Sequence, residues 1–212
     1  MPFTYDHPHP AVATDIAIFT VRDRALSVLL IRRAGQPFAG WWALPGGFLG
    51  PDEDLDSCAR RELVEETGVD APVLFSFGNF SDPKRDPRER VISVAYLALL
   101  PSGVPLAAGS DAAEAQWFGM GELPQLAFDH GKILEAALRA LRARARELGM
   151  IFALLPERFS LNELQAAYEA VLGTAADKRN FRKVVLESGE IVETDAVAGG
   201  RHRPARQYRR LV

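Results

Sequence analysis

The sequence has a single cysteine, and this scarcity excludes whole classes of protein. Because Cys58 has no second cysteine to pair with, no disulfide framework is available, and a reducing cytoplasm is the expected location. No apolar run approaches the roughly 18–20 residues that a membrane-spanning helix needs. The first residues, MPFTYDHPHP, lack the basic patch and the apolar stretch of a signal peptide. These absences predict a cytoplasmic protein without a membrane partner.

The residues that are present have an ordinary globular composition, 48% hydrophobic and 25% charged over 212 residues. This length suits one large domain or two small ones. The charge is uneven, because residues 1–150 hold 15 basic and 20 acidic side chains, whereas residues 151–212 hold 10 and 8. The change of sign indicates two parts, which we place at residues 1–150 and 151–212.

An acidic cluster lies in the segment RELVEETGV, residues 61–69, where Glu62, Glu65 and Glu66 share one face of a predicted helix. Like charges at this spacing repel each other when they are exposed, and Arg61, four residues before Glu65, can relieve part of the repulsion. A solvated acidic face is one interpretation. A site for a hard cation is the other, because Mg²⁺ prefers carboxylate oxygens.

The surrounding residues favour the cation site. The spacing is Gly47, five residues, Glu53, seven residues, Arg61-Glu62-Leu63, one residue, Glu65-Glu66, one residue, Gly68-Val69. A chance match to seven single-residue positions has a probability on the order of 10⁻⁹ per start site. This segment resembles the complete signature of the Nudix family, whose enzymes cleave a nucleoside diphosphate linked to another group.

The resemblance implies a role for each signature residue. It implies that Mg²⁺, with Mn²⁺ as a second candidate, is held by Glu62, Glu65 and Glu66 and by the backbone carbonyl of Gly46. Arg61 is then expected to orient Glu65, and Glu53 to support the loop. Gly47 is expected to let the backbone turn tightly near the substrate phosphates. The predicted catalytic residues are Glu53, Arg61, Glu62, Glu65 and Glu66.

The coarse pattern of the first 150 residues predicts strands near residues 11–21, 26–33, 72–80, 91–100 and 115–118. Helices are predicted at residues 55–66, closed by Gly68, and from His130 to about residue 148. Strands with helices on both faces predict an α/β/α sandwich with a mixed sheet, which is the Nudix fold. Trp41 and Trp42 are expected to pack in the core or at a dimer contact, although stacking on a base is the alternative.

The polar loop at residues 81–90 has the composition of a functional loop. Arg85 and Arg88 are candidate substrate-binding residues, because their forked donors suit phosphates, although holding the loop in place is an equal alternative. The general base stays unassigned from the sequence. The candidates are Glu53, Glu66 and the loop acids Asp82, Asp86 and Glu89.

The last 62 residues predict helix, helix and hairpin. Ser160 and Glu163 form a capping box before one helix, and Asp177 is the expected N-cap of the next. This order is that of a winged helix. The predicted DNA-binding residues lie on the second helix and on the wing: Lys178, Arg179, Asn180, Arg182, Lys183, Arg201 and Arg203. A small interaction domain with solvated basic residues is the alternative.

The whole chain is similar to the Nudix-related transcriptional regulators of NAD and sugar metabolism. That resemblance implies a homodimer that binds operator DNA and senses a ligand such as ADP-ribose. Many members lack signature acids, whereas this sequence keeps them all. Three hypotheses follow: a Mg²⁺-dependent hydrolase of ADP-ribose or a related nucleoside diphosphate derivative, a ligand-sensing regulator with little or no hydrolysis, and a hydrolase whose C-terminal part serves dimerisation only. The intact signature favours the first, and the first two are compatible in one chain.

Overall fold

A computed structural model describes residues 6–68, 70–104, 114–145, 147–198 and 205–211. The strands are β1 Ala11–Arg22, β2 Ala25–Arg32, β3 Trp42–Ala43, β4 Gly46–Phe48, β5 Val73–Phe80, β6 Val91–Leu99, β7 Glu114–Gly119, β8 Ile191–Ala198 and β9 Ala205–Arg210. The helices are α1 Leu55–Thr67, α2 His130–Arg144, α3 Leu148–Phe152, α4 Leu161–Leu172 and α5 Lys178–Glu187. The short elements β3, β4 and α3 were not predicted. No helix in these ranges is long and apolar enough to span a bilayer.

The main sheet is mixed, as predicted. Its strand order is β3-β2-β1-β6-β5, with β4 paired to β1 and β7 paired to β2. The β1–β6 pair is parallel, and the other pairs are antiparallel. The β1–β2 hairpin turns at Asp23 and Arg24, which both have positive φ angles, 47° and 64°. Two such residues give the turn a twist that matches the strands.

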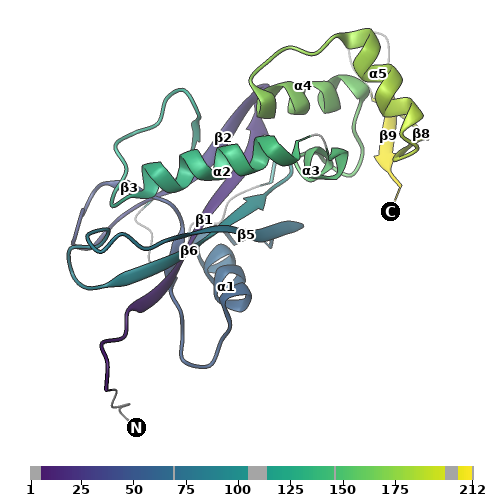
Figure 1. Ribbon diagram of the computed structural model, residues 1–212. Helices are drawn as coiled ribbons and strands as arrows, with labels where there is room; N and C mark the ends of the chain where they lie inside the picture. Colours follow the sequence, from purple (N-terminus) through teal and green to yellow (C-terminus); the bar gives the residue numbers. More distant parts are fainter. Residues whose placement is uncertain (1–5, 69, 105–113, 146, 199–204, 212) are drawn as a thin grey trace.

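Helices cover both faces of this sheet (Figure 1). Side chains alternate along a strand, so Ile16 and Ile18 of β1 face α1, where they join Leu63 in one apolar cluster. Phe19 points the other way, into the cluster that contains Ile133 of α2. The predicted α/β/α sandwich is therefore confirmed.

The cap residues of α1 explain where it begins and ends. The side chain of Asp54 accepts a hydrogen bond from the backbone N–H of Ser57 at 2.8 Å, and Gly68 closes the helix with a φ of 70°. The predicted end at residue 66 is one residue short. These caps place Glu62 and Glu66 on the buried side of the helix and leave Glu65 exposed.

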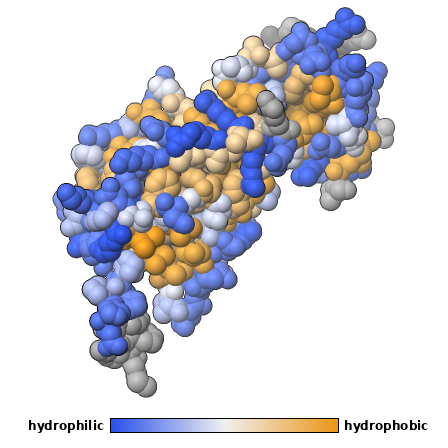
Figure 2. Space-filling model, viewed as in Figure 1, coloured by the Kyte–Doolittle hydropathy of each residue, from blue (hydrophilic) through white to orange (hydrophobic). Residues whose placement is uncertain are grey.

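The C-terminal unit comprises α3, α4, α5 and the β8–β9 hairpin, in the predicted order of helix, helix and hairpin (Figure 1). The capping box of Ser160 and Glu163 is present at α4, and Asp177 caps α5. Leu164 and Val171 of α4 pack with Phe181 and Val185 of α5 in the same apolar cluster as α2. The two units of the chain thus share one continuous core. Figure 2 shows hydrophilic residues along the outer edge of this unit.

Candidate functional site

Arg61 stands at the centre of the acidic cluster on α1. Its guanidinium donates two hydrogen bonds to Glu53, at 2.7 and 3.0 Å. The Nη1 group also donates to Glu62 at 2.6 Å and to Glu65 at 3.1 Å. Three of the four predicted catalytic glutamates thus meet on the one cation Arg61. Glu66 lies buried one turn after Glu62 on the same helix.

Glu53 connects this cluster to the loop that precedes α1. Its Oε1 atom accepts a hydrogen bond from the backbone N–H of Gly50 at 2.7 Å. The hydrogen bonds from Arg61 and from Gly50 lower the pKa of Glu53 to about 2. The same contacts with Glu53 and Glu62 raise the pKa of Arg61. Both groups are therefore charged at neutral pH, and Glu53 is a weak base in this arrangement.

Two glycines let the backbone approach this cluster. Gly46 has a φ of 152°, and a Cβ atom there would lie 2.0 Å from the carbonyl oxygen of Thr14. A Cβ atom on Gly47 would lie 2.1 Å from Oε1 of Glu62. Gly46 at the start of β4 therefore has the backbone angle that favours glycine, whereas Gly47 makes room for the Glu62 carboxylate. Burial raises the pKa of Glu62, against the opposing effect of Arg61.

The carboxylates of α1 are hard oxygen donors, and their chemistry suits Mg²⁺. The space that Gly47 leaves beside Glu62 fits the same role, because any side chain there would displace the carboxylate. In this structure Arg61 lies between Glu62 and Glu65 and binds both. Across the described ranges, no three His, Cys, Asp or Glu side chains are grouped as a ready metal site. The carboxylates are of the right type to bind a metal ion, but in this structure Arg61 holds Glu62 and Glu65.

A cavity of about 190 Å³ opens beside Gly46 and Gly47. Its walls include three arginines and two phenylalanines: Arg33, Arg85, Arg88, Phe48 and Phe128. Gly47, Arg85 and Arg88, the predicted substrate-binding residues, thus line one cavity. Its cationic and aromatic walls suit a ligand that combines anionic groups with a planar ring.

Arg85 is buried and holds three segments together. Its Nη2 group lies 2.9 Å from Oδ2 of Asp15 on β1 and 2.9 Å from Oδ1 of Asp129, just before α2. Asp15 also accepts a hydrogen bond from Ser93 of β6 at 2.6 Å. Burial disfavours the charged arginine, yet the two carboxylates raise its pKa. Arg85 therefore ties the loop to the sheet and to α2, the alternative that we had left open.

Arg88 pairs with Asp86 of its own loop, at 2.7 and 3.0 Å. Its guanidinium also lies 5.6 Å from the ring centre of Phe48 and 5.9 Å from that of Phe128. The hydrogen bond from Arg88 lowers the pKa of Asp86, which makes Asp86 a weak general base. Another acid of this loop, Asp82, accepts a hydrogen bond from the backbone N–H of Lys84.

His130 is a buried residue that lines the cavity. Its Nδ1 atom accepts a hydrogen bond from the backbone N–H of Leu44 at 2.9 Å, and its Nε2 atom lies 3.3 Å from Asp15. Burial lowers the pKa of His130, so the ring is neutral at pH 7 and carries its proton on Nε2. The sequence pattern indicates His130 only as the start of a helix, and its place in the cavity depends on the fold.

Arg33 and Phe128 are further cavity residues that the sequence analysis missed. The guanidinium of Arg33 lies 4.8 Å from the ring centre of Phe128, and its Nε donates to the carbonyl oxygen of Pro37 at 3.0 Å. Burial and the nearby Arg88 lower the pKa of Arg33. A charged residue directly after an apolar strand was the available signal. Trp42, in contrast, packs edge-on against Phe118, as a core residue does.

The predicted DNA-binding helix α5 turns Phe181 and Val185 inward and leaves Arg179 and Lys183 exposed. Lys178 and Asn180 are exposed as well. Arg182 instead lies against α4, where its Nη2 group donates to Oδ1 of Asn162 at 2.9 Å. Arg201 and Arg203 lie outside the described residues. The exposed part of the helix is therefore basic near its start.

Comparisons with known proteins match both parts of the chain. Residues 9–137 match the model of the NUDIX domain, and residues 151–210 match that of the NrtR DNA-binding winged helix domain. The ADPR responsive transcriptional repressor NtrR of Acinetobacter baylyi is 38% identical over 208 residues, which cover 96% of this chain and 83% of the relative. The ADP-ribose pyrophosphatase of Methanocaldococcus jannaschii is 44% identical over 131 residues, which cover 62% of this chain and 75% of the relative.

A solved structure of the same two-domain type is also similar. The crystal structure of Shewanella oneidensis NrtR complexed with a 27mer DNA matches with a TM-score of 0.84 and 31% identity, covering 94% of this chain and 93% of the other. The similarity runs through both the sandwich and the C-terminal unit, so the predicted winged helix is confirmed. The chain therefore belongs to the Nudix family, as a Nudix domain followed by an NrtR-type winged helix.

Proposed function

We propose that this chain is a DNA-binding transcriptional regulator whose Nudix domain binds ADP-ribose as its effector. The observation that carries the proposal is the presence, in one chain, of a cavity with three arginine walls and a separate helix with exposed basic residues. The relative that spans nearly the whole chain is named an ADPR responsive repressor. This support places the regulator ahead of the hydrolase, which the signature alone had favoured.

The cavity suits a nucleoside diphosphate because its three arginines differ in how far nearby carboxylates neutralise them. Asp15 and Asp129 neutralise Arg85, and Asp86 neutralises Arg88. Arg33 forms no ion pair with a carboxylate among the residues that the structure describes, so its charge is available to a phosphate. Phe128 lies beside it and offers an apolar surface to a ribose or a base. We propose Gly47, Arg33, Arg85 and Arg88 as the residues around the diphosphate.

DNA binding is proposed for the winged helix, for which we keep the limits 151–212. Arg179 and Lys183 form the centre of the exposed face of α5, and Lys178 and Asn180 flank it. Arg182 braces the helix from the side. Arg201 and Arg203 remain proposals for the wing. Phosphate contacts by such residues release counterions, so affinity falls as salt rises, with a log–log slope of about −0.9 per phosphate neutralised.

The test compares a labelled duplex from the region upstream of the protein's own gene with a random duplex of equal length. We expect the first to bind more tightly across a range of salt, and ADP-ribose to weaken that binding. Arg179→Ala should weaken both duplexes without altering ADP-ribose affinity. Equal affinity for the two duplexes at every salt concentration would contradict the proposal.

A homodimer is part of the proposal, because an operator with two half-sites requires two winged helices. Figure 2 shows apolar residues gathered over the Nudix domain in the part of the view where Figure 1 draws β5 and α1. Strand β5 is at an edge of the sheet and carries half-buried Phe75, Phe77 and Phe80. Such an edge suits a second copy of the chain. Light scattering at micromolar concentration should give twice the chain mass of 23.3 kDa.

Hydrolysis of ADP-ribose by the Nudix domain is a second proposed function. The observation in its favour is the convergence of Glu53, Glu62 and Glu65 on Arg61, with Glu66 on the same helix. Glu62, Glu65, Glu66 and the carbonyl of Gly46 are the proposed ligands of Mg²⁺ or Mn²⁺. The chemistry that the metal supplies when bound is charge neutralisation on the diphosphate and activation of water.

The residues of the chain have separate tasks in this second proposal. Arg61 holds Glu62 and Glu65 in one orientation, and Glu53 anchors Arg61 to the loop. Arg33 and Arg88 hold the diphosphate, whose charge would otherwise repel an attacking water. The test incubates the pure protein and Mg²⁺ with a panel of nucleoside diphosphate derivatives and identifies products by mass. AMP and ribose phosphate from ADP-ribose are the expected products. An unchanged panel would remove the hydrolase proposal and leave the regulator.

A further inference from the structure

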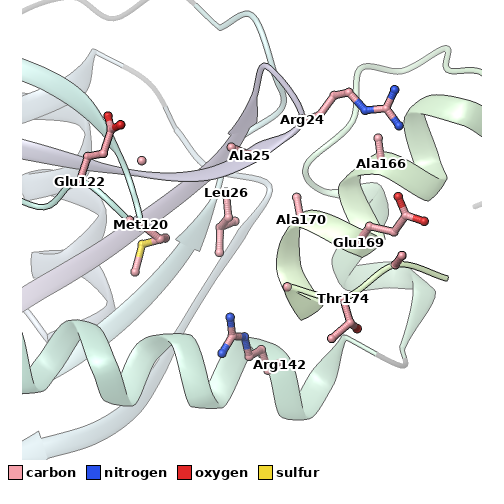
Figure 3. Close-up of a pocket in the computed structure, with 14 residues that line it drawn as sticks. Arg24, Ala25, Leu26, Met120, Glu122, Arg142, Ala166, Glu169, Ala170 and Thr174 are labelled. Carbon is pink, nitrogen blue, oxygen red and sulfur yellow. The ribbon is translucent and has the colours of Figure 1, made fainter.

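A large cleft lies between the two domains. It has a volume of about 670 Å³, and Figure 3 shows side chains from both sides that line it. The Nudix domain contributes Arg24 from the β1–β2 turn, Met120 after β7 and Arg142 from α2, whereas α4 contributes Glu169 and Ala170. Any change in the angle between the domains must change this cleft.

Arg142 crosses the cleft. Its Nε group donates a hydrogen bond to the backbone carbonyl of Val171 at 3.0 Å. That carbonyl belongs to the last turn of α4, where backbone oxygens lack partners within the helix. A Cβ atom on Gly173 would lie 3.2 Å from Nη2 of Arg142, so the guanidinium also fits closely against the helix end. In Figure 3 the side chain of Arg142 rises from α2 into the cleft.

The opposite end of α2 borders the effector cavity. Asp129 precedes the helix and holds Arg85 through two hydrogen bonds, and His130 is its first residue and lines the cavity. From His130 to Arg142 the helix rises about 18 Å. Ile133, Ala137 and Leu141 are fully buried along this length and belong to one core. The helix therefore connects the two cavities as a rigid body.

The end of α4 is in turn fixed to the start of α5. The carboxylate of Glu169 accepts a hydrogen bond from the backbone N–H of Ala176 at 2.9 Å, which lies in the short loop between the two helices. Asp177, the next residue, caps α5 and so sets the position of the basic helix. A displacement of the α4 end thus reaches the residues proposed to contact DNA.

From these contacts we infer that Arg142 is a positioning residue through which α2 transmits the occupancy of the effector cavity to the winged helix. The inference rests on the proposed function. A diphosphate in the effector cavity competes with Asp129 for the donors of Arg85, and this competition moves the first turn of α2. Arg142 carries that movement to the Val171 carbonyl. Without Arg142, ligand and DNA still bind, but they no longer influence each other.

The test measures coupling as the ratio of two dissociation constants for the upstream duplex, with and without saturating ADP-ribose. The variants are Arg142→Ala, Arg142→Lys and, as a matched control, Arg139→Ala, an exposed arginine one turn earlier on α2. For the wild type and Arg139→Ala we expect a ratio of about 5 to 150, the usual range of allosteric coupling. For Arg142→Ala we expect a ratio below about 2. Lysine can still donate to the Val171 carbonyl, so Arg142→Lys should restore part of the ratio.

Two affinities separate this role from a merely structural one. Titration calorimetry measures the affinity for ADP-ribose, and a DNA-binding assay measures the affinity of the ligand-free protein for the upstream duplex. Both affinities should stay within about threefold of the wild type in Arg142→Ala, while the ratio collapses. A wild-type ratio in Arg142→Ala would overturn the inference and leave the proposed function intact. Loss of ligand-free DNA binding in this variant would also overturn it, since Arg142 would then only hold the fold. A wild-type protein without any response would overturn the proposed function, and the inference with it.

Discussion

Two arginine-centred clusters lie near Gly46 and Gly47, and they differ mainly in burial. The side chain of Arg61 is 37% exposed and gathers Glu53, Glu62 and Glu65, whereas that of Arg85 is 5% exposed and gathers Asp15 and Asp129. The Arg61 guanidinium stays in contact with water, so it can exchange one partner for another with a small change in free energy. A buried cluster loses much more when one partner is removed. An arginine bound by carboxylates is thus open to water in the Arg61 cluster, whereas in the Arg85 cluster it holds the walls of the cavity together.

The largest difference between the clusters is expected in stability. Arg85→Gln leaves the buried Asp15 and the half-buried Asp129 without their cation and should lower the free energy of unfolding by about 3–5 kcal/mol. Arg61→Gln removes the ion pairs of a guanidinium that is 37% exposed, and it should lower the free energy of unfolding less, by about 1 kcal/mol. Urea denaturation followed by tryptophan fluorescence measures both. Equal losses in the two variants would show that burial does not separate the clusters.

A double variant tests the cause of that loss. Asp15→Asn with Arg85→Gln removes a negative charge together with the positive one and keeps the side-chain volumes similar. If the uncompensated charge causes the instability, the double variant should recover part of what Arg85→Gln loses. A double variant that is less stable than Arg85→Gln alone would point to lost packing instead.

Hydrolytic activity should depend on the side of the molecule that contributes less to stability, because α1 carries both the Arg61 cluster and the proposed metal ligands. Glu66→Gln removes one proposed metal ligand without changing the shape of α1, and ADP-ribose turnover should fall by about 100-fold or more. Stability should hardly change, because glutamine fills the same volume. Steady-state turnover at saturating Mg²⁺, with Asp56→Asn on the first turn of α1 as control, measures the effect. Wild-type turnover in Glu66→Gln would exclude the carboxylate face as the metal site.

Local signals made the helices and the acidic cluster predictable. Asp54 and Gly68 limit α1 through contacts within a few residues, and Ser160 and Glu163 do the same for α4. The signature spacing likewise reports a local loop and helix. These features depend on neighbours in sequence, which a linear pattern records.

The cavity was only half predictable, because its other half depends on pairing between distant strands. Asp15 meets Ser93 and Arg85 only because β1 and β6 lie parallel, about 80 residues apart in the chain. Arg33 and Phe128 come from two further segments and carry no motif of their own. The contact of Arg142 with a backbone carbonyl leaves no trace in residue identity at position 171. Short elements such as β3 and α3 are equally dependent on tertiary packing.

A third arginine sharpens the comparison, because Arg33 belongs to neither cluster. Arg33 forms no ion pair with a carboxylate in the described part of the chain, so its charge can meet a phosphate. Arg33→Ala should therefore weaken ADP-ribose binding by about 10- to 100-fold, the usual effect of a charge-assisted hydrogen bond. Arg32→Ala is the matched control, because Arg32 is exposed and pairs with Glu114 at 3.6 Å away from the cavity. Titration calorimetry compares the two. Similar affinities for both variants would mean that Arg33 does not face the ligand.

The smallest expected difference is in pH dependence, where each cluster has its own window. Burial lowers the pKa of His130, in contact with the Arg85 cluster, below its ordinary value of 6.5. The unfolded chain then binds more protons than the folded chain as the pH falls below 6.5. The stability linked to His130 is therefore complete above that pH and is lost below it. Glu53 in the Arg61 cluster has its pKa lowered from 4.5 to about 2, so its contribution is complete above pH 4.5 and declines only in more acid solution.

Replacing His130 or Glu53 by a residue that cannot titrate should remove that group's contribution to the pH dependence of stability. His130→Asn keeps an acceptor for the backbone N–H of Leu44 but cannot gain a proton, so its urea midpoint should change less than that of the wild type between pH 7.5 and pH 5. Glu53→Gln should follow the wild type in that range and deviate only below about pH 4.5. Both are measured with a chelator present, so that no metal ion competes with Arg61 for the carboxylates. If His130→Asn and the wild type fall in parallel from pH 7.5 to pH 5, a group other than His130 controls the acid response of the buried cluster.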